Sequence, residues 1–263
     1  MIGAIIGDIA GSRFEGVINH KSKDFELFNE HCDFTDDTVL TVAVAAAVWA
    51  CKGDYKKLSE NTVKTLIVCG RLYEDRGYGG MFCEWLYSEN KRPYNSYGNG
   101  SAMRVSPVAW AGKMLTEVKK LSRMVTEITH NHPEGIKGAE ATAVCIFLAR
   151  KGYNIAKIRK YVAKNYYALD FTLAEIRDNY DFDATCQGSV PQAIEAFLES
   201  TSFEDAIRNA ISIGGDSDTI AAITGSIAEA YYGVPLALRN RALSYLDVNL
   251  KKIITDFEKT FPV

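Results

Sequence analysis

Apolar residues recur along this chain at the three- and four-residue spacing of amphipathic helices, and one run is apolar on every face. That run, Val39 to Ala50, predicts a helix at the centre of the fold, because a helix without a polar face has no side to turn toward water. A second apolar, alanine-rich run spans Thr219 to Tyr232. The spacing predicts further helices at residues 2–10, 55–71, 81–87, 106–114, 116–129, 139–150, 155–167, 191–198 and 205–211.

No segment sustains the two-residue alternation of a half-buried strand, and no period of 20 to 50 residues indicates a repeat protein. Two stretches are polar and predict loops: residues 12–33, which would expose Arg13 and Glu15, and residues 92–104, where Pro93 and glycines exclude regular structure. We therefore expect an all-α protein. Its helices would form one compact, orthogonally packed domain over residues 1–263, with a hydrophobic content of 47% to supply the core.

Charge, apolar run length and cysteine spacing exclude several classes of protein. The net charge of −3 comes with scattered lysines and arginines, so we expect no binding to bulk nucleic acid. Asp8 interrupts the apolar start, which has no basic residues before it, and the longest apolar run is shorter than the roughly 20 residues of a membrane helix. The six cysteines show no C-x-x-C spacing and predict reduced thiols. These features predict a soluble, cytoplasmic protein, which we expect to be a monomer.

Two short acidic motifs precede the two alanine-rich runs and carry the strongest functional signal. Thr35, Asp36 and Asp37 stand before the first run, and Asp216 and Asp218 stand before the second. At a helix N-cap junction the first residue is not helical, so neighbouring carboxylates can turn toward one point. Such oxygen-only ligands suit Mg²⁺ or Mn²⁺, and four carboxylates fit two metal ions about 3.5–4 Å apart better than one. The alternative is that Asp37 and Asp218 only cap helices, which leaves the other two carboxylates unexplained.

Other candidates are weaker when taken singly. Glu15 lies in a glycine-flanked loop and could bind metal or handle a proton, or it could be an ordinary surface residue. Between Tyr94 and Gly100, glycine-exposed amides and a serine hydroxyl could hold phosphate oxygens. His130 has no set of partners for zinc, so we expect it to hydrogen-bond a ligand or the backbone. His20 and His31 lie in polar stretches and are expected to be solvated.

Taken together, these residues resemble the ADP-ribosylglycohydrolase family, over nearly the whole chain and in the family's order. Six segments carry the resemblance: GDIAGSRFEG (7–16), FTDDT (34–38), RGYGG (76–80), YGNGSAMR (97–104), THNHPEGIKGA (129–139) and GGDSDTIAAITGSIAEAYYG (214–233). The segments between these motifs are shorter than in longer relatives, which leaves the acceptor of ADP-ribose open.

The resemblance implies an all-α hydrolase with a binuclear Mg²⁺ or Mn²⁺ centre at helix N-termini. Its implied metal ligands are Thr35, Asp36, Asp37, Asp216, Asp218 and Thr219. Glu15, Asp36, Asp37 and Asp218 would be catalytic, with Glu15 matching the family's mobile glutamate. The substrate-binding set would be Gly77, Gly79, Ser96, Tyr97, Gly98, Asn99, Gly100 and His130.

The implied reaction is cleavage of the glycosidic bond between ADP-ribose and a protein side chain, with arginine as the first expectation, or a small ADP-ribosyl compound. Two alternatives stay open: a catalytically silent ADP-ribose-binding or structural homologue, and a metal-dependent nucleotide phosphohydrolase. A silent homologue would be free to lose one of the metal-binding acids, and none is missing. A phosphohydrolase would have no need for the complete set of ADP-ribose loops.

Overall fold

The computed structural model describes residues 1–16 and 20–262, so part of the loop expected at residues 12–33, namely residues 17–19, lies outside the described residues. The described chain forms fifteen α-helices and two short 3-10 helices, η1 (Ser12–Phe14) and η2 (Tyr55–Lys57). The α-helices are α1 (Ile2–Gly11), α2 (Asp36–Ala50), α3 (Leu58–Leu72), α4 (Gly80–Tyr87), α5 (Gly100–Met103), α6 (Ser106–Ala111), α7 (Leu115–Thr126), α8 (Pro133–Arg150), α9 (Ile155–Asn165), α10 (Leu173–Ile176), α11 (Cys186–Leu198), α12 (Phe203–Ile211), α13 (Ser217–Tyr232), α14 (Leu236–Tyr245) and α15 (Val248–Thr260).

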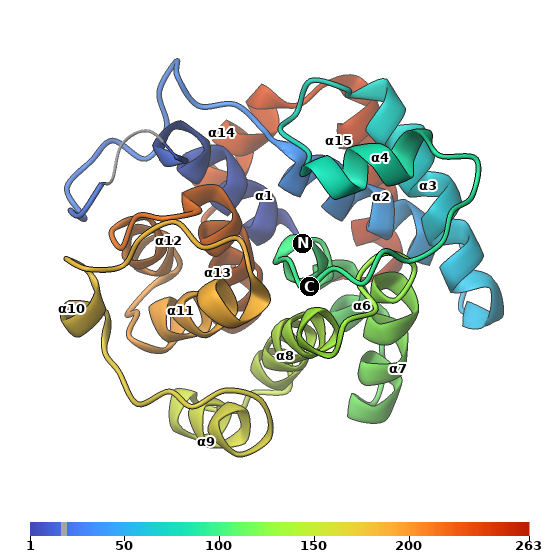
Figure 1. Ribbon diagram of the computed structural model, residues 1–263. Helices are drawn as coiled ribbons and strands as arrows, with labels where there is room; N and C mark the ends of the chain where they lie inside the picture. Colours follow the sequence, from blue (N-terminus) through green and yellow to red (C-terminus); the bar gives the residue numbers. More distant parts are fainter. Residues whose placement is uncertain (17–19, 263) are drawn as a thin grey trace.

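The expected all-α, single-domain architecture is confirmed. Among the described residues no strand occurs, and an isolated bridge pairs Gly98 with Thr185. Helix α13 packs against α1, α12, α11 and α8, while α2 packs against α3, α15, α1 and α6 (Figure 1). Both α2 and α13 are buried over most of their length, as their apolar sequences predicted. No helix in the described part of the chain is long and apolar enough to cross a membrane.

Helices α1 and α13 approach so closely that their contact requires glycine. A Cβ placed on Gly7 would lie 2.0 Å from the carbonyl oxygen of Ala221, and one on Gly3 would lie 2.1 Å from that of Gly225. One more turn along, a Cβ on Gly11 would lie 2.5 Å from the Cα of Asp218. Since these three glycines recur every four residues, they form one face of α1. This face brings the end of α1 against the acidic start of α13.

Several element boundaries differ from those expected. Helix α8 begins at Pro133 rather than at residue 139, because His132 accepts a hydrogen bond from the Glu134 amide and Pro133 suits the first helical position. Helix α11 begins at Cys186, and Pro191 lies inside it rather than at its start. The loop expected at residues 92–104 ends in the short helix α5, because the Asn99 carbonyl accepts the amides of the next turn.

Besides α5, three helices have no counterpart among the sequence-based predictions. Helix α10 lies between the helices expected at residues 155–167 and 191–198, and α14 and α15 form the last part of the chain. Helix α15 contributes buried Leu250, Ile254 and Phe257 to the face that packs on α2. The remaining positions of these helices are largely exposed, so their apolar pattern is narrow.

Candidate metal and substrate site

The two acidic motifs, far apart in sequence, meet where the N-termini of α2 and α13 face one another. The hydroxyl of Thr219 donates a hydrogen bond to Oδ2 of Asp37, 3.1 Å away. At the start of α2, Thr35 is the N-cap, and its hydroxyl accepts from the Asp37 amide. At the start of α13, the N-cap Asp216 makes no side-chain capping bond. Of the two aspartates considered as caps, Asp218 accepts the Thr219 amide at 2.9 Å, whereas Asp37 does not cap α2. Capping therefore leaves the carboxylates of Asp37 and Asp216 unexplained, which argues against an exclusively structural interpretation of the motifs.

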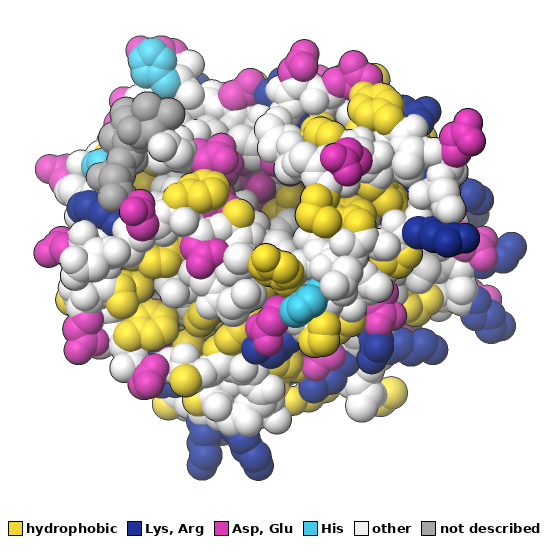
Figure 2. Space-filling view, in the orientation of Figure 1, with side chains coloured by type: hydrophobic (Ala, Val, Ile, Leu, Met, Phe, Trp, Pro, Cys, Tyr) yellow, Lys and Arg dark blue, Asp and Glu magenta, His cyan; other side chains and the backbone are white. Residues whose placement is uncertain are grey.

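A cavity of about 340 Å³ opens beside these helix ends. Figure 2 shows the hollow, with acidic side chains inside it and hydrophobic side chains around it. Its wall includes the acidic residues, the two glycine-bearing loops and a group of apolar residues. The lining residues are Glu15, Asp36, Asp37, Leu40, Gly77, Gly79, Gly80, Met81, Phe82, Tyr94, Ser96, Gly98, Asn99, Gly100, Met103, Arg104, His130, Phe182, Ala184, Asp216, Asp218 and Thr219.

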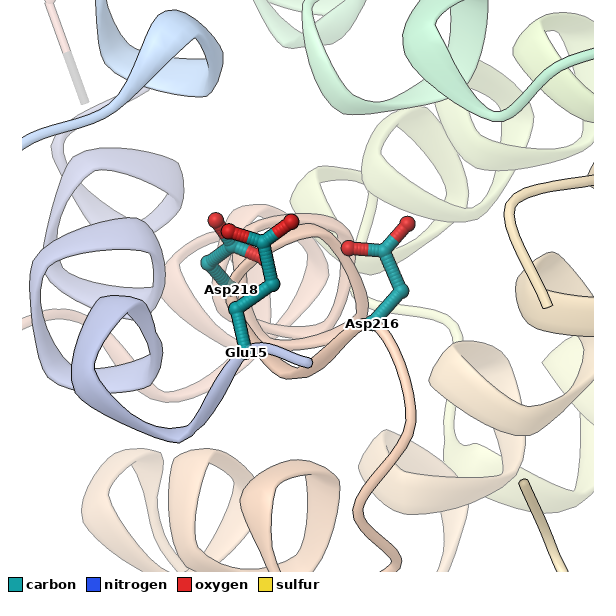
Figure 3. Close-up of side chains that lie close together, drawn as sticks. All are labelled: Glu15, Asp216 and Asp218. Carbon is teal, nitrogen blue, oxygen red and sulfur yellow. The ribbon is translucent and has the colours of Figure 1, made fainter. Parts of the chain in front are cut away.

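Three carboxylates in this cavity are close enough to hold one ion. Glu15, Asp216 and Asp218 each offer an oxygen, and these oxygens lie within 4.8 Å of one another (Figure 3). Glu15 comes from the residue after η1, whereas the two aspartates come from the start of α13. Asp36 and Asp37 line the same cavity. Five carboxylates are thus gathered at one place from three segments of the chain.

The electrostatics of these five carboxylates explain why we expect them to bind a cation. Burial, reinforced by the neighbouring carboxylates, raises the pKa values of Asp36, Asp37 and Asp218 well above those of free aspartate. Burial also raises the pKa of Glu15, and the charge of Asp216 adds to it. Oδ1 of Asp37 is buried without a hydrogen-bond partner. Oxygen-only donors in this number fit a hard divalent cation such as Mg²⁺ or Mn²⁺.

The backbone before α13 is shaped to present Asp216 to the cavity. Gly214 and Gly215 both adopt positive φ, at 72° and 76°, a region in which other residues are strained. The side-chain amide of Asn99 then donates to Oδ2 of Asp216 at 2.7 Å. This bond ties the predicted substrate loop directly to a predicted metal ligand.

Asp8 is a further acidic residue at the site that the sequence analysis did not select. It is fully buried in α1 and accepts hydrogen bonds from the amides of Thr35 and Thr38, each at 3.0 Å, and from both threonine hydroxyls. Its pKa is raised to about 6 by burial, partly offset by these bonds. Asp8 thus fixes the start of α2 beneath Asp36 and Asp37. Asp8 was not selected from the sequence because its neighbours are apolar. An aspartate inside an otherwise apolar helix is nevertheless a sign of a buried, paired carboxylate.

In the absence of divalent cations, we expect stability to fall as the pH rises. Unfolded aspartates titrate near 3.8, whereas Asp8 titrates at about 6 in the folded protein and Asp36, Asp37 and Asp218 are also raised. The folded state therefore binds more protons in this range, and the free energy of unfolding decreases with rising pH. Thermal unfolding of the chelated protein between about pH 5 and about pH 7 measures this.

Saturating Mg²⁺ should remove most of that decrease, because the cation stabilises the ionised carboxylates. A chelated protein whose melting temperature climbs over the same pH range would contradict the interpretation.

The glycine-bearing loop before α5 forms the opposite wall of the cavity. The hydroxyl of Ser96 accepts the Gly98 amide at 3.1 Å, and the Asn99 amide donates to the Ala184 carbonyl at 2.8 Å. These bonds fix the turn, and Gly100 then begins α5. Across from it, Gly77 has φ of 87°, and a Cβ placed there would lie 3.8 Å from Oδ1 of Asp36.

The cavity brings together all but two of the residues singled out from the sequence. Thr35 and Tyr97 are not among the described residues that line it. The hydroxyl of Thr35 donates to Asp8 at 2.7 Å, and Tyr97 is 47% exposed with its ring against that of His132.

The expectation that His20 is solvated is wrong, because its ring packs against Phe14 and Phe25. His31 is exposed, as expected. The described cysteines are free thiols.

Known proteins resemble this chain in sequence over most of its length. A sequence model of the ADP-ribosylglycohydrolase family matches residues 1–258. ADP-ribosylhydrolase ARH3 of Mus musculus is 25% identical over 312 residues, covering 89% of this chain and 83% of its own, and the Homo sapiens protein of that name is also 25% identical, covering 89% and 84%. ADP-ribosylarginine hydrolase Tri1 of Pseudomonas putida (strain GB-1) is 24% identical, covering 89% and 70%.

A solved structure described as an ADP-ribosylglycohydrolase-related protein complex matches the fold. Its TM-score is 0.72 with 20% sequence identity, and the match covers 98% of this chain and 96% of the other. The helical architecture is therefore shared along nearly the whole length of both chains.

Proposed function

This chain belongs to the ADP-ribosylglycohydrolase family, and from that premise we propose that it hydrolyses the glycosidic bond between ADP-ribose and an acceptor, with divalent cations bound at the acidic centre. The observation that carries the proposal is the convergence of Glu15, Asp216 and Asp218 in a cavity that also contains Asp36 and Asp37. The same cavity is walled by a glycine-bearing loop, so one space offers both a cation site and a phosphate site.

The residues divide between holding cations and holding substrate. Thr35, Thr219 and the four aspartates of the two motifs would bind two Mg²⁺ or Mn²⁺ ions. The Thr35 hydroxyl donates to Asp8 and accepts the Asp37 amide, so it would bind a cation through its second lone pair. When bound, these ions would hold ribose hydroxyls and lower the pKa of an attacking water. Cleavage at the anomeric carbon develops oxocarbenium character, which carboxylates on that side of the ring stabilise.

Glu15 and the loop residues take the remaining roles. The raised pKa of Glu15 suits a group that accepts a proton from the attacking water. Ser96, Gly98, Asn99 and Gly100 line the cavity on a turn that is fixed by the Gly98–Ser96 and Asn99–Ala184 hydrogen bonds, and this turn at the start of α5 would hold diphosphate oxygens. His130 would donate to the ligand from the wall behind this loop, with Gly77 and Gly79 bordering the same space.

We expect the acceptor to be the guanidinium of a protein arginine. A cationic leaving group suits an acidic cavity, and one relative is named an ADP-ribosylarginine hydrolase. The relatives named ARH3 match over a larger share of their own length, 83% and 84% against 70%, and carry no acceptor in that name, so serine and small ADP-ribosyl compounds belong in the test.

The decisive experiment offers the purified protein mono-ADP-ribosylated arginine, serine and nucleic-acid substrates, each with Mg²⁺ and with a chelator. We expect Mg²⁺-dependent release of ADP-ribose, fastest from arginine. Binding of ADP-ribose without any release would indicate the silent homologue. Release of nucleoside monophosphate or inorganic phosphate from nucleotides would indicate the phosphohydrolase instead.

Free ADP-ribose should raise the melting temperature of the Mg²⁺-loaded protein. A ligand that binds only the folded state adds RT ln(1 + [L]/Kd) to the free energy of unfolding, about 2.7 kcal/mol at a hundredfold excess over Kd. Ser96→Ala should reduce the shift, because its hydroxyl fixes the Gly98 amide. Ser244→Ala, which removes a hydroxyl from the distant helix α14, is the matched control and should leave the shift unchanged. No shift at millimolar ADP-ribose with Mg²⁺ present would count against an ADP-ribose site.

A further inference from the structure

Arg104, directly after α5, is the largest fully buried side chain in the described part of the protein. Its Nη2 donates to the hydroxyl of Thr129 at 2.6 Å, while its Nε and Nη1 have no hydrogen-bond partner among the described residues. A guanidinium stays charged even in such surroundings, and although the nearby Asp36 carboxylate offsets part of the cost, burying a charge with two unpartnered nitrogens remains unfavourable. A residue held at that cost next to the cavity calls for a role beyond packing.

Arg104 lines the cavity, and it also acts on the cavity through Thr129 and the next residue, His130. The Thr129 hydroxyl oxygen lies 2.8 Å from Nδ1 of His130 and 3.4 Å from the Thr126 carbonyl. Because a guanidinium only donates, the oxygen must accept from Arg104, which leaves one hydroxyl proton to place. Accepting from a cation makes a hydroxyl a stronger donor, so its proton goes to the nearer partner, Nδ1.

The consequence is a defined state of the imidazole. With Nδ1 occupied as an acceptor, the ring is neutral and carries its proton on Nε2. Burial and the positive charge of Arg104 both lower the pKa of His130, which keeps the ring uncharged. Nε2 lies at the glycine edge of the substrate loop: a Cβ placed on Gly100 would be 3.5 Å from it, and one on Gly98 would be 3.7 Å away. Any other residue at these two positions would place its Cβ in van der Waals contact with this nitrogen.

We propose that Arg104 and Thr129 are positioning residues that hold His130 as a neutral hydrogen-bond donor, with its Nε2–H directed at an oxygen of the bound ligand. His130 then orients the ligand without supplying a proton to the reaction. The identity of that ligand rests on the proposed function, whereas the state of the ring is a property of the free protein and is tested separately.

Nitrogen-15 NMR of histidine-labelled protein reads the ring directly, because protonated and unprotonated ring nitrogens have distinct shifts. The signal that disappears in His130→Gln identifies the residue among the four histidines. At neutral pH we expect a protonated Nε2 and an unprotonated Nδ1. A proton on Nδ1 alone, or on both nitrogens, would overturn the proposal.

Variants test whether the two positioning residues set that state. Thr129→Val keeps the shape but removes the hydroxyl, and we expect it to mix the two tautomers, whereas Thr129→Ser should keep the wild-type pattern. Arg104→Gln removes the charge and should raise the pH at which His130 titrates. Thr62→Val, which removes a buried hydroxyl from α3, controls for general destabilisation and should leave the His130 signals unchanged. If Arg104→Gln does not fold, Thr129→Val decides, and an unchanged tautomer in it would overturn the proposal.

A binding measurement separates this inference from the proposed function. With Mg²⁺ present, calorimetry should show ADP-ribose binding about tenfold more weakly to Thr129→Val than to wild type, the effect of a misdirected hydrogen bond. Equal affinity would mean that the tautomer does not direct ligand binding and would overturn that half of the proposal. Failure of the wild-type protein to bind ADP-ribose, with the expected NMR pattern intact, would reject the proposed ligand while the assignment of the ring stands.

Discussion

Asp218→Asn is expected to reduce turnover by about a thousandfold or more, since metal binding contributes several kcal/mol of charge stabilisation and each 1.36 kcal/mol is tenfold in rate. Asp218 lies at the start of α13, where its charge is held among those of Asp216, Asp37 and Glu15. The amide keeps the size of the side chain and removes the anionic oxygen. Asp216→Asn should also reduce turnover, because it removes a second anionic oxygen from the site. It should leave the neighbouring loop in place, because Asn99 can still donate to the remaining carbonyl oxygen.

Metal content and turnover should be measured on the same preparation, by elemental analysis and by release of ADP-ribose. Asp256→Asn on α15, which removes a surface carboxylate paired with Lys252, is the matched control and should keep both. Near-wild-type activity in both α13 variants would show that these two aspartates have only a structural role at the start of the helix. Zero metal equivalents in the reconstituted wild-type protein would remove the cation from the proposal altogether.

Glu15→Gln is expected to slow turnover severely while leaving the fold and ADP-ribose binding almost intact. The residue follows η1 and retains an exposed portion, so the variant disturbs little packing. Its carboxylate nevertheless lies with those of Asp216 and Asp218, and its raised pKa fits proton transfer. We expect affinity for ADP-ribose to stay within about tenfold, or ~1.4 kcal/mol, of wild type.

Turnover, melting temperature and ADP-ribose affinity of this variant should be compared with those of Glu30→Gln, which alters an exposed glutamate. Unchanged turnover would show that Glu15 is an ordinary surface residue with no catalytic role. A large loss of melting temperature would make it structural. Loss of affinity together with turnover would place it in ligand binding rather than in the chemical step.

Local sequence was sufficient for the two central helices and for the acids at their starts. A run such as Val39 to Ala50, apolar except for Thr41, predicts a buried helix, and the polar motif before it is typical of a helix start. In the structure the helix is buried over most of its length, and only its end at Trp49 and Ala50 is exposed. The same reasoning failed where helices depend on their neighbours. Helix α15 buries a narrow apolar face against α2, and α8 gains a turn from the His132 cap, which the apolar pattern alone does not reveal.

The acidic and glycine-bearing motifs of the site could thus be selected from the sequence, because carboxylates beside helix starts and glycines in turns are local chemical signals. Which of them meet was decided by the tertiary structure, through the glycine face of α1 that draws Asp218 against it and the bond from Thr219 to Asp37. Asp8 and Arg104 escaped selection for the same reason. Each is a single charge among apolar neighbours, and its partners are distant in sequence, so only packing reveals that it is buried and what it holds in place.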